Sequence, residues 1–273
     1  MRLRSDVNPA LAMPEPFSPL DRDRIVSGLA AGCLVGREVE IFTETDSTND
    51  LARRAAEAGA AEGLVFFAET QRAGRGRRGS AWVSPSGGGL WFSTLLRPRA
   101  ARETWPRLTL LAVHAVIETA ARVAGVVADW KWPNDVTVGT RKLAGILVET
   151  TPEFVVLGIG LNVRQRAGDF PEVLRDRAIS VEMITGSAIE REALAAGILS
   201  ALDRDYRGDW AGAGFASVRE YCVERSALRP GCTVRVVVGG KTVDGRLLGF
   251  TPEAHLRIDC AGLEHEINEG LVE

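Results

Sequence analysis

The hydrophobic and polar positions of the chain predict helices in four stretches. Residues 45–60 begin with hydroxyl and amide side chains and continue with helix formers to Gly59, which is typical of an N-capped helix. Residues 108–124 are nearly all helix formers, many of them apolar, and Gly125 follows as a stop signal. This stretch predicts a long, largely buried helix. Two more helices are expected over residues 189–210 and 215–223.

Runs rich in β-branched and aromatic residues predict strands between these helices. They cover residues 64–70, 88–97, 126–132, 135–150 and 153–163. The turn at Gly139-Thr140 and the corner at Thr151-Pro152 make the later connections short, and short connections join antiparallel neighbours. The sequence therefore predicts an α+β fold, with a mostly antiparallel sheet and helices packed on it.

The pattern changes after Pro230, where short strands alternate with glycine turns over residues 232–238, 241–250, 255–259 and 263–268. This pattern predicts a separate small β barrel with its boundary near Ser226. We expect three parts: an N-terminal tail with a short helix (residues 1–34), a larger α+β domain (35–225) and the C-terminal barrel (226–273). Four prolines suggest that the tail is loose: Pro9, Pro14, Pro16 and Pro19.

Composition narrows the class of protein. The net charge of −3, with 45% hydrophobic and 25% charged residues, is ordinary for a soluble globular protein and argues against a general nucleic-acid binder. We expect no membrane association, because no apolar run reaches the roughly 18 residues that a membrane span requires, and the N-terminus lacks the apolar core of a secretory signal. The four cysteines are widely spaced, which favours free thiols in a reducing cytoplasm.

The stretch Gln71–Trp82 concentrates four arginines and three glycines. Glycines let backbone N–H groups approach a ligand closely, and arginine side chains around them make an anion-binding loop. The loop lacks the Gly-Lys-Ser/Thr ending of a P-loop. Two alternatives stay open for the loop taken alone: a solvated basic turn, or an RNA contact of the arginine-glycine type.

A second candidate is the corner Asp129–Val136, where Pro133 predicts a rigid turn between strands. The corner displays Lys131, Asn134 and Asp135, and an amide and a carboxylate beside a basic loop are suitable ligands for Mg²⁺ and phosphate. The alternative is an Asn-Asp turn that stabilises itself.

Two strands carry further candidates. In Arg141–Glu149, Lys142 stands at the strand entrance and Gly145 in its middle, where a glycine often marks the close approach of a ligand. An edge lysine and a β-bulge would explain both residues equally well. In Gly158–Val163, Asn162 carries an amide that could bind an adenine edge, or it could simply close a buried strand.

Taken together and in order, these motifs resemble the biotin protein ligases. The resemblance runs from about Val35 to the C-terminus and rests on TDSTND, QRAGRGRRGSAW, KWPNDV, KLAGILVE and GIGLNV. It implies a catalytic domain with a class II synthetase-like fold, followed by an SH3-like barrel. It also implies that biotin and ATP give biotinyl-5′-AMP and pyrophosphate, and that biotin then passes to one lysine of a biotin carboxyl carrier domain.

The resemblance also implies roles for individual residues. Biotin would contact Ser47, Thr48, Asn49, Gln71, Gly74, Arg75, Gly76, Arg77, Lys142 and Gly145. ATP would contact Arg75, Arg77, Trp82, Asn134, Asp135, Lys142 and Asn162, with the indole of Trp82 packed on adenine. The catalytic residues would be Arg77, Lys142 and Asp135, and Asp135 would also bind Mg²⁺. Many relatives carry another basic residue where Ser80 stands, so that one phosphate contact would be missing or would come from Arg72 or Arg78.

The reaction explains this set of residues. A carboxylate that attacks the α-phosphate brings two anions together, and like charges 4 Å apart repel by about 4 kcal/mol at an effective dielectric constant near 20. Arg75, Arg77, Lys142 and Mg²⁺ would cancel this repulsion, and a glycine-rich loop that closes would exclude water from the mixed anhydride. An acceptor lysine is only about 0.04% neutral at pH 7, and Asp135 is a candidate for orienting or deprotonating it.

About 35 residues precede the catalytic part, roughly half of what a winged helix-turn-helix needs, so we expect an enzyme that does not bind DNA. It would be a monomer or a homodimer. One alternative class is a nucleic-acid-binding module built around the arginine loop. The other is a lipoate or octanoate transferase with a related fold, which the motifs from Lys142 to Glu149 alone would not separate well from a biotin ligase.

Overall fold

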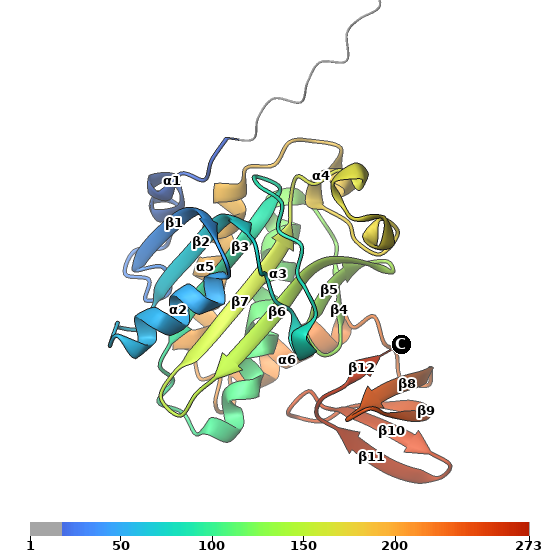
Figure 1. The fold of residues 1–273 in the computed structure, drawn as a ribbon. Helices are drawn as coiled ribbons and strands as arrows, with labels where there is room; N and C mark the ends of the chain where they lie inside the picture. Colours follow the sequence, from blue (N-terminus) through green and yellow to red (C-terminus); the bar gives the residue numbers. More distant parts are fainter. Residues whose placement is uncertain (1–17, 273) are drawn as a thin grey trace, which may run out of the picture.

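The computed structural model describes residues 18–272, and a seven-stranded mixed sheet lies at its centre. The strands are β1 (Glu38–Thr45), β2 (Leu64–Gln71), β3 (Gly89–Leu96), β4 (Asp129–Lys131), β5 (Asp135–Val138), β6 (Arg141–Thr150) and β7 (Val155–Asn162), in the spatial order β1-β2-β3-β7-β6-β5-β4 (Figure 1). The β1–β2 pair is parallel and every other pair in this sheet is antiparallel. The predicted α+β class with a mostly antiparallel sheet is confirmed.

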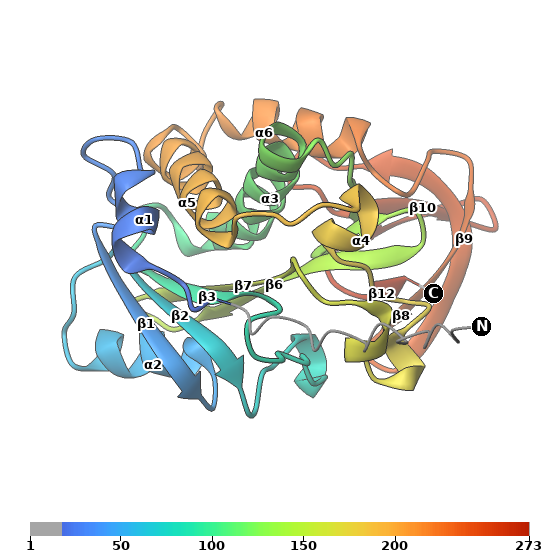
Figure 2. The same cartoon turned by 90° about the horizontal axis from the view of Figure 1, so that it is seen from above.

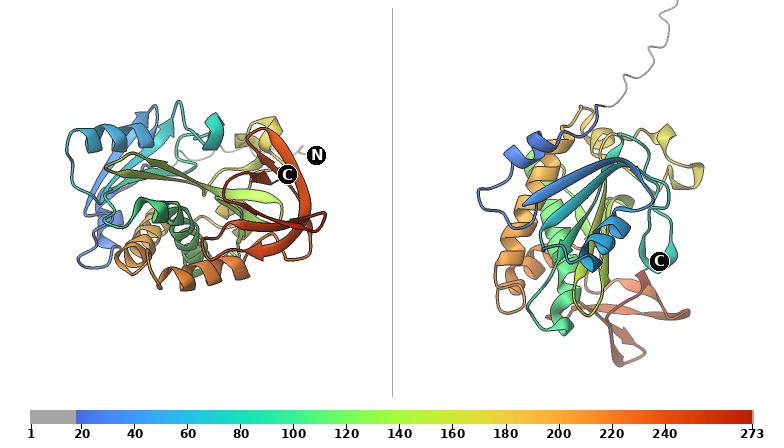
Figure 3. Two further views of the ribbon diagram at one scale, coloured as in Figure 1. Left: turned by 90° about the horizontal axis from the view of Figure 1, so that it is seen from below. Right: turned by 60° about the vertical axis from the view of Figure 1, so that its left-hand side comes forward.

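Helices cover the two faces of this sheet unequally. The helix α2 (Thr48–Glu57) packs on one face against β2, β3 and β7, and α3 (Leu108–Ala124) packs on the other (Figures 2 and 3). The helices α5 (Arg191–Arg207) and α6 (Phe215–Glu224) pack on α3. Because most helices share one face, the other face stays open beside α2.

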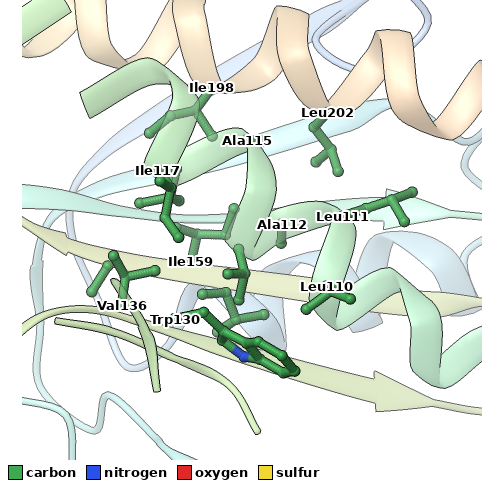
Figure 4. Packing of buried hydrophobic residues seen from close by; sticks show 14 of the residues in the cluster. Leu110, Leu111, Ala112, Ala115, Ile117, Trp130, Val136, Ile159, Ile198 and Leu202 are labelled. Carbon is green, nitrogen blue, oxygen red and sulfur yellow. The ribbon is translucent and has the colours of Figure 1, made fainter. Parts of the chain in front are cut away.

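The main core fills the layer between the sheet and α3. Figure 4 shows apolar side chains of α3 lying between α5 and the strands. Its labelled residues come from α3 (Leu110, Leu111, Ala112, Ala115, Ile117), the sheet (Trp130, Val136, Ile159) and α5 (Ile198, Leu202). The predicted long buried helix is therefore confirmed, and it ends at Gly125 in the left-handed conformation, with φ 65°.

The strand β1 was not predicted from the sequence. Its residues Glu38, Glu40 and Glu44 are exposed, whereas Val39 is buried. Charged residues have a low strand propensity, and β1 lies at an edge of the sheet, where one side of the strand needs no partner. The crossover through α2 returns the chain parallel to β1, which long connections permit.

The N-terminal segment departs from the predicted loose tail wherever it is described. Residues 1–17 lie outside the described part of the chain. From Ser18 onward the segment is fixed: Arg191 Nη2 donates to the Ser18 carbonyl at 2.7 Å, and the Leu20 N–H donates to Glu69 Oε1 at 2.5 Å. The short helix α1 (Arg22–Ser27) follows, capped by Asp21. The prediction of a loose tail was wrong for these residues, because the buried ion pair between Arg191 and Glu69 anchors them. The prolines in the sequence gave no sign of this anchor.

The C-terminal strands form a second sheet of five antiparallel strands. They are β8 (Thr233–Val238), β9 (Lys241–Phe250), β10 (Leu256–Cys260), β11 (Leu263–Ile267) and β12 (Leu271–Val272), in the order β11-β10-β9-β8-β12. This sheet contacts the corner after β4, where Trp132 Nε1 donates to the Ala254 carbonyl at 3.0 Å and Trp130 packs on Phe250. The domain boundary near Ser226 stays a prediction.

Smaller elements complete the described chain. They are α4 (Val181–Thr185) and short 3-10 helices at Arg77–Gly79, Arg102–Arg107, Ala167–Asp169 and Glu172–Leu174. The four cysteines are free, as predicted. Within residues 18–272, no helix combines the length and the apolar character that crossing a membrane requires.

Candidate active site

A cavity of about 430 Å³ opens on the sheet face that carries α2. Its walls come from the arginine loop, the start of α2, the corner before β5, the middle of β6 and β7, and the C-terminal strand β12. The lining residues are 47–49, 71, 75–82, 92, 131–135, 142, 145–147, 158–160 and 270–272. Segments far apart in the sequence therefore meet at one place.

The cavity collects most residues that the motifs singled out. Of the predicted site residues, the following line it: Ser47, Thr48, Asn49, Gln71, Arg75, Gly76, Arg77, Trp82, Asn134, Asp135, Lys142 and Gly145. Two do not. The Gly74 carbonyl accepts a hydrogen bond from the Trp82 N–H at 2.8 Å, so that Gly74 closes the base of the loop. Asn162 is buried and lies behind the cavity wall.

The amide of Asn162 is committed to the protein. Its Nδ2 donates to the carbonyls of Lys142 and Ile179, and its Oδ1 accepts from Gln165 Nε2 at 3.1 Å. In this geometry Asn162 bridges the start of β6 and the segment before α4, and its contact with adenine stays a prediction. The sequence alone cannot tell an amide that binds a ligand from one that bonds within the protein, because each is a polar residue at the end of a buried strand.

The start of α2 forms a hydrogen-bonded polar wall. Ser47 stands at the N-cap position of α2, but its side chain makes no capping hydrogen bond. The Gln71 Oε1 atom accepts from the Thr48 N–H at 2.9 Å, and Gln71 Nε2 donates to Ser84 Oγ at 2.9 Å. Thr48 and Asn49 both contact Ser93, which lies below them on β3. The wall is thus held by hydrogen bonds within the protein.

The two arginines expected at the reaction differ in their surroundings. The Arg75 guanidinium donates two hydrogen bonds to the Asp50 carboxylate, at 2.8 and 2.6 Å, and lies 3.6 Å from Glu149. The pKa of Asp50 is lowered by its hydrogen bonds from Arg75, and the pKa of Arg75 is raised by the same bonds. The charge of Arg75 is therefore balanced within the protein, and this residue ties the loop to α2.

Arg77, in contrast, has no carboxylate partner at hydrogen-bonding distance within the described chain. Its Nη1 donates to Asn134 Oδ1 at 3.3 Å. Burial lowers the pKa of Arg77, and the neighbouring Arg78 charge lowers it further. A partly buried cation that is poorly neutralised attracts an anionic ligand.

A cation and a carboxylate face each other across the strands β5 and β6. Lys142 Nζ lies 2.7 Å from Asp135 Oδ1. The amide of Asn134 is occupied on both sides, because its Nδ2 donates to the Ile146 carbonyl at 2.8 Å while its Oδ1 accepts from Arg77. The corner itself contains a cis peptide bond between Trp132 and Pro133.

Asp135 is the one carboxylate in the cavity lining of the described chain. Among residues 18–272 there is no group of three or more His, Cys, Asp or Glu side chains that could hold a metal ion. A protein-only magnesium site is therefore not formed by these residues. Asp135 could instead complete the coordination of a Mg²⁺ ion whose other ligands are phosphate oxygens and water, which is a frequent arrangement for this ion.

Trp82 lies on the glycines of the cavity floor. A Cβ atom added at Gly145 or Gly160 would lie 2.9 or 2.5 Å from its ring, so both glycines are needed for this packing. Lys142 Nζ lies 5.1 Å from the ring centroid, and the buried indole N–H has no hydrogen-bond partner among residues 18–272. The ring thus occupies the space above Gly145, one of the residues that the resemblance assigns to biotin.

Arg72 and Arg78 were the two residues that could replace the basic side chain missing at Ser80, and the structure places them differently. Ser80 donates to the Arg77 carbonyl at 2.9 Å and contributes no charge. Arg72 is paired with Glu44 and Asp46 outside the cavity lining, whereas Arg78 lines the cavity. Arg78 is therefore the residue near enough to supply a basic contact.

Comparison with known proteins identifies the family. Residues 41–165 match the family described as Biotin/lipoate A/B protein ligase. The chain is 33% identical over 258 residues to a biotin–[acetyl-CoA-carboxylase] ligase of Mycobacterium tuberculosis, which covers 92% of this chain and 94% of that one. The chain belongs to the biotin/lipoate A/B protein ligase family. A bifunctional ligase/repressor BirA of Bacillus subtilis is 35% identical over 243 residues, covering 87% of this chain and 72% of that protein.

Solved structures of biotin/lipoate ligase family members share the fold. A biotin protein ligase of Aquifex aeolicus, in complex with biotin and ATP, matches with a TM-score of 0.77 and 28% identity, covering 87% of this chain and 98% of that one. The apo structure of the same ligase matches with a TM-score of 0.73. The expected class II synthetase-like architecture is confirmed by this likeness.

Several residues that line the cavity of this ligase-family chain were not predicted from the sequence. Gly158 and Gly160 alternate along β7, and this spacing was a readable sign of close approach on one face of the strand. Gly270, Leu271 and Val272 reach the cavity from the C-terminal sheet. No local pattern in the sequence marks these three, because their position depends on how the second sheet packs against the first.

Proposed function

We propose that this protein is an ATP-dependent biotin ligase. It forms biotinyl-5′-AMP and pyrophosphate from biotin and ATP, and it then transfers biotin to a lysine of a biotin carboxyl carrier domain. The observation that carries the proposal is a single cavity that joins an ordered polar wall at α2 to the cations Arg77 and Lys142, in a chain of the biotin/lipoate ligase family. The Aquifex aeolicus ligase binds both biotin and ATP in a similar fold.

The polar wall suits the ureido group of biotin. Thr48 and Gln71 offer hydrogen-bonding atoms on this wall, and a buried polar pocket discriminates strongly when every group must find its partner. The bicyclic ring would lie above Gly145, which leaves room beside the strand. Because Trp82 packs there now, its ring must move when biotin binds, and stacking on adenine would give it a new partner.

The cations lower the barrier of the first step. A carboxylate oxygen of biotin attacks the α-phosphorus of ATP, a P–O bond forms, and the bond to pyrophosphate breaks. Arg77 and Lys142 would face the two anions and stabilise the charge that develops between them. Arg75 has Asp50 as its counterion, so its part would be to anchor the loop over the product.

In the proposed reaction Mg²⁺ would bind together with ATP. When bound, Mg²⁺ would neutralise the phosphate charge. Asp135 would then hold the ion or the incoming amine, and its present contact with Lys142 would give way to these partners. Asn134 would fix Arg77 at the phosphates.

In the second step the neutral amine of the acceptor lysine attacks the acyl carbon, and AMP leaves with the bonding electrons. Asp135 is the carboxylate available in the cavity to orient the amine or to take its proton. The acceptor class, a biotin carboxyl carrier domain of a carboxylase, is suggested by the names of the relatives. A cytoplasmic location, the absence of DNA binding, and a monomeric or homodimeric state remain predictions from the sequence.

The test is transfer to a purified biotin carboxyl carrier domain. The protein is incubated with ATP, Mg²⁺ and the carrier, together with either biotin or lipoate, and the mass of the carrier is measured. We expect ATP-dependent addition of one biotin and no addition of lipoate. Lipoate transfer without biotin transfer would support the rival lipoate ligase and contradict the proposal.

A further inference from the structure

A carboxylate outside the cavity lining fixes the orientation of the Asn49 side chain. Asn49 is buried at the start of α2, and its Nδ2 donates to Glu149 Oε2 at 2.7 Å. A carboxylate oxygen only accepts hydrogen bonds, so the amide nitrogen must face Glu149 and the amide oxygen must face away from it. Arg53 and Arg75 lie 3.2 and 3.6 Å from the same carboxylate oxygen and keep it in place.

The orientation of Asn49 dictates where the Ser93 proton goes. Asn49 Oδ1 accepts from Ser93 Oγ at 2.5 Å, and Ser93 is fully buried on β3. A hydroxyl group has one proton, so Ser93 has none left for Thr48 Oγ1, which lies 2.7 Å away. In this pair Thr48 must therefore be the donor.

Thr48 has no proton to spare for a ligand. Within the described chain, its other side-chain partner is Gln71 Oε1 at 3.1 Å. That atom also accepts from the Thr48 backbone N–H, so it must be the amide oxygen and can only accept. Because the hydroxyl proton points to Ser93, the Thr48 oxygen presents only lone pairs to the cavity that it lines.

We propose that Glu149 is a specificity-determining positioning residue. Through Asn49 and Ser93 it makes Thr48 Oγ1 a pure acceptor, and it thereby selects a ligand that presents an N–H group at this point. The inference rests on the proposed function, in which this group is a ring N–H of the biotin ureido unit. Lipoate and octanoate have no N–H to offer, and they would leave a buried acceptor unpaired.

A glutamine at position 149 would remove this selection while preserving size. Arg53 and Arg75 hold a neutral amide less strongly than a carboxylate, so the glutamine could present either its oxygen or its nitrogen and the Asn49 amide could turn over. Ser93 would then accept from Asn49 and donate to Thr48, and Thr48 could offer its own proton to a ligand. The wall would no longer distinguish a donor from an acceptor.

The experiment compares biotin with its two cyclic carbamate analogues, in each of which one ring N–H is replaced by oxygen. The readout is kcat/KM for ATP–pyrophosphate exchange. We expect the wild type to prefer biotin over one of the two analogues by at least a hundredfold. Glu149→Gln should lower this preference at least tenfold, mainly through KM for biotin, with kcat within threefold of the wild-type value.

Three further variants separate positioning from a general structural effect. Thr48→Val removes the acceptor, and in that background Glu149→Gln should leave the preference unchanged within twofold. Thr48→Ser keeps the hydroxyl and should retain the preference. Glu153→Gln, at an exposed site just after β6, is the matched control and should behave like the wild type.

Two results would overturn the inference: a wild-type preference in Glu149→Gln, or an equal loss of preference when Glu149→Gln is made with and without Thr48→Val. If the wild type activates biotin, either of these results leaves the proposed function intact. A wild type that shows no biotin-dependent exchange overturns both the proposed function and the role of Glu149.

Discussion

Lys142 Nζ and Asp135 Oδ1 lie 2.7 Å apart, across the antiparallel pairing of β5 and β6. This contact places a cation and a carboxylate side by side in the lining of the cavity. In the proposed reaction the anionic substrates replace Asp135 as the partner of Lys142. The two side chains therefore belong to different steps, and their substitutions should separate those steps.

Substitution of Lys142 should impair the first step. Lys142→Met keeps much of the side-chain length but removes one of the two cations that face the reacting anions. The loss of such an electrostatic contact costs about 10²- to 10³-fold in rate. We expect a decrease of this size in biotin-dependent ATP–pyrophosphate exchange, while Lys241→Met, on the exposed hairpin between β8 and β9, serves as the control and stays at the wild-type rate. A change below threefold in Lys142→Met would argue against its role.

Substitution of Asp135 should impair the second step more than the first. Asp135→Asn keeps the shape of the side chain but cannot take a proton from the acceptor lysine. Loss of general base catalysis costs about 10²- to 10⁴-fold. The measurement is single-turnover transfer from preformed biotinyl-5′-AMP to the carrier domain. Full transfer by the variant would eliminate Asp135 as the group that orients or deprotonates the amine.

Arg77 should retain the acyl nucleotide under the loop. Arg77→Gly removes the partly buried cation that contacts Asn134, and the loop then closes less tightly over the product. We expect biotinyl-5′-AMP to escape and to label lysines of bystander proteins in a lysate, detected by blotting for biotin. The matched variant Arg72→Gly lies outside the cavity lining and should label the carrier alone. Equal selectivity of the two variants would count against retention by Arg77.

The contact between Asp50 and Arg75 should give a stability that depends on pH. The pKa of Asp50 is lowered by hydrogen bonds from Arg75, so the contribution is present above the unfolded-state pKa and is lost as the pH falls through the lower folded-state pKa. The free energy of unfolding should differ between the wild type and Asp50→Asn by a constant amount from about pH 8 to pH 5, and by less below about pH 4. Urea titrations across this range measure the difference. A gap that widened in acid would contradict the ion pair.

The buried ion pair between Arg191 and Glu69 should carry more stability than an exposed pair. Arg191 Nη1 lies 2.7 Å from Glu69 Oε2, and the Arg191 side chain is 1% exposed. Arg191→Met leaves a buried carboxylate without its partner, which costs about 3–5 kcal/mol. Arg72→Met removes an exposed partner of Glu44 and Asp46 and should cost about 0–1 kcal/mol. Urea unfolding of both variants tests this ranking, and similar losses would refute it.

The fold could be predicted from the sequence where a pattern repeats locally. The helix at 108–124 and the strands from residue 135 to residue 163 follow from apolar periodicity and glycine turns, and the structure has them. The strand β1 could not be predicted, because its exposed glutamates have a low strand propensity and the strand is stabilised by its pairing with β2. The anchoring of Ser18 could not be predicted either, because Arg191 is 173 residues away in the sequence.

The candidate site was predictable only in part. The motifs identified Gln71, Arg77 and Lys142, since charge and amide groups stand out beside glycines. The hydrogen-bond commitments of Asn162 and the neutralisation of Arg75 by Asp50 were invisible, because both depend on which side chains meet in space. Residue type therefore indicated the chemistry, and only the packing decided which groups remain available to a ligand.

In the proposed reaction Arg77 and Lys142 together face the acyl phosphate of bound biotinyl-5′-AMP. A crystal structure of the protein with a non-hydrolysable analogue of this nucleotide would show whether they do. We expect the Arg77 guanidinium and Lys142 Nζ both to lie within about 3.2 Å of oxygen atoms of the linkage between biotin and the phosphate. The proposed role of the two cations fails if the analogue is bound while both lie beyond hydrogen-bonding distance of that linkage.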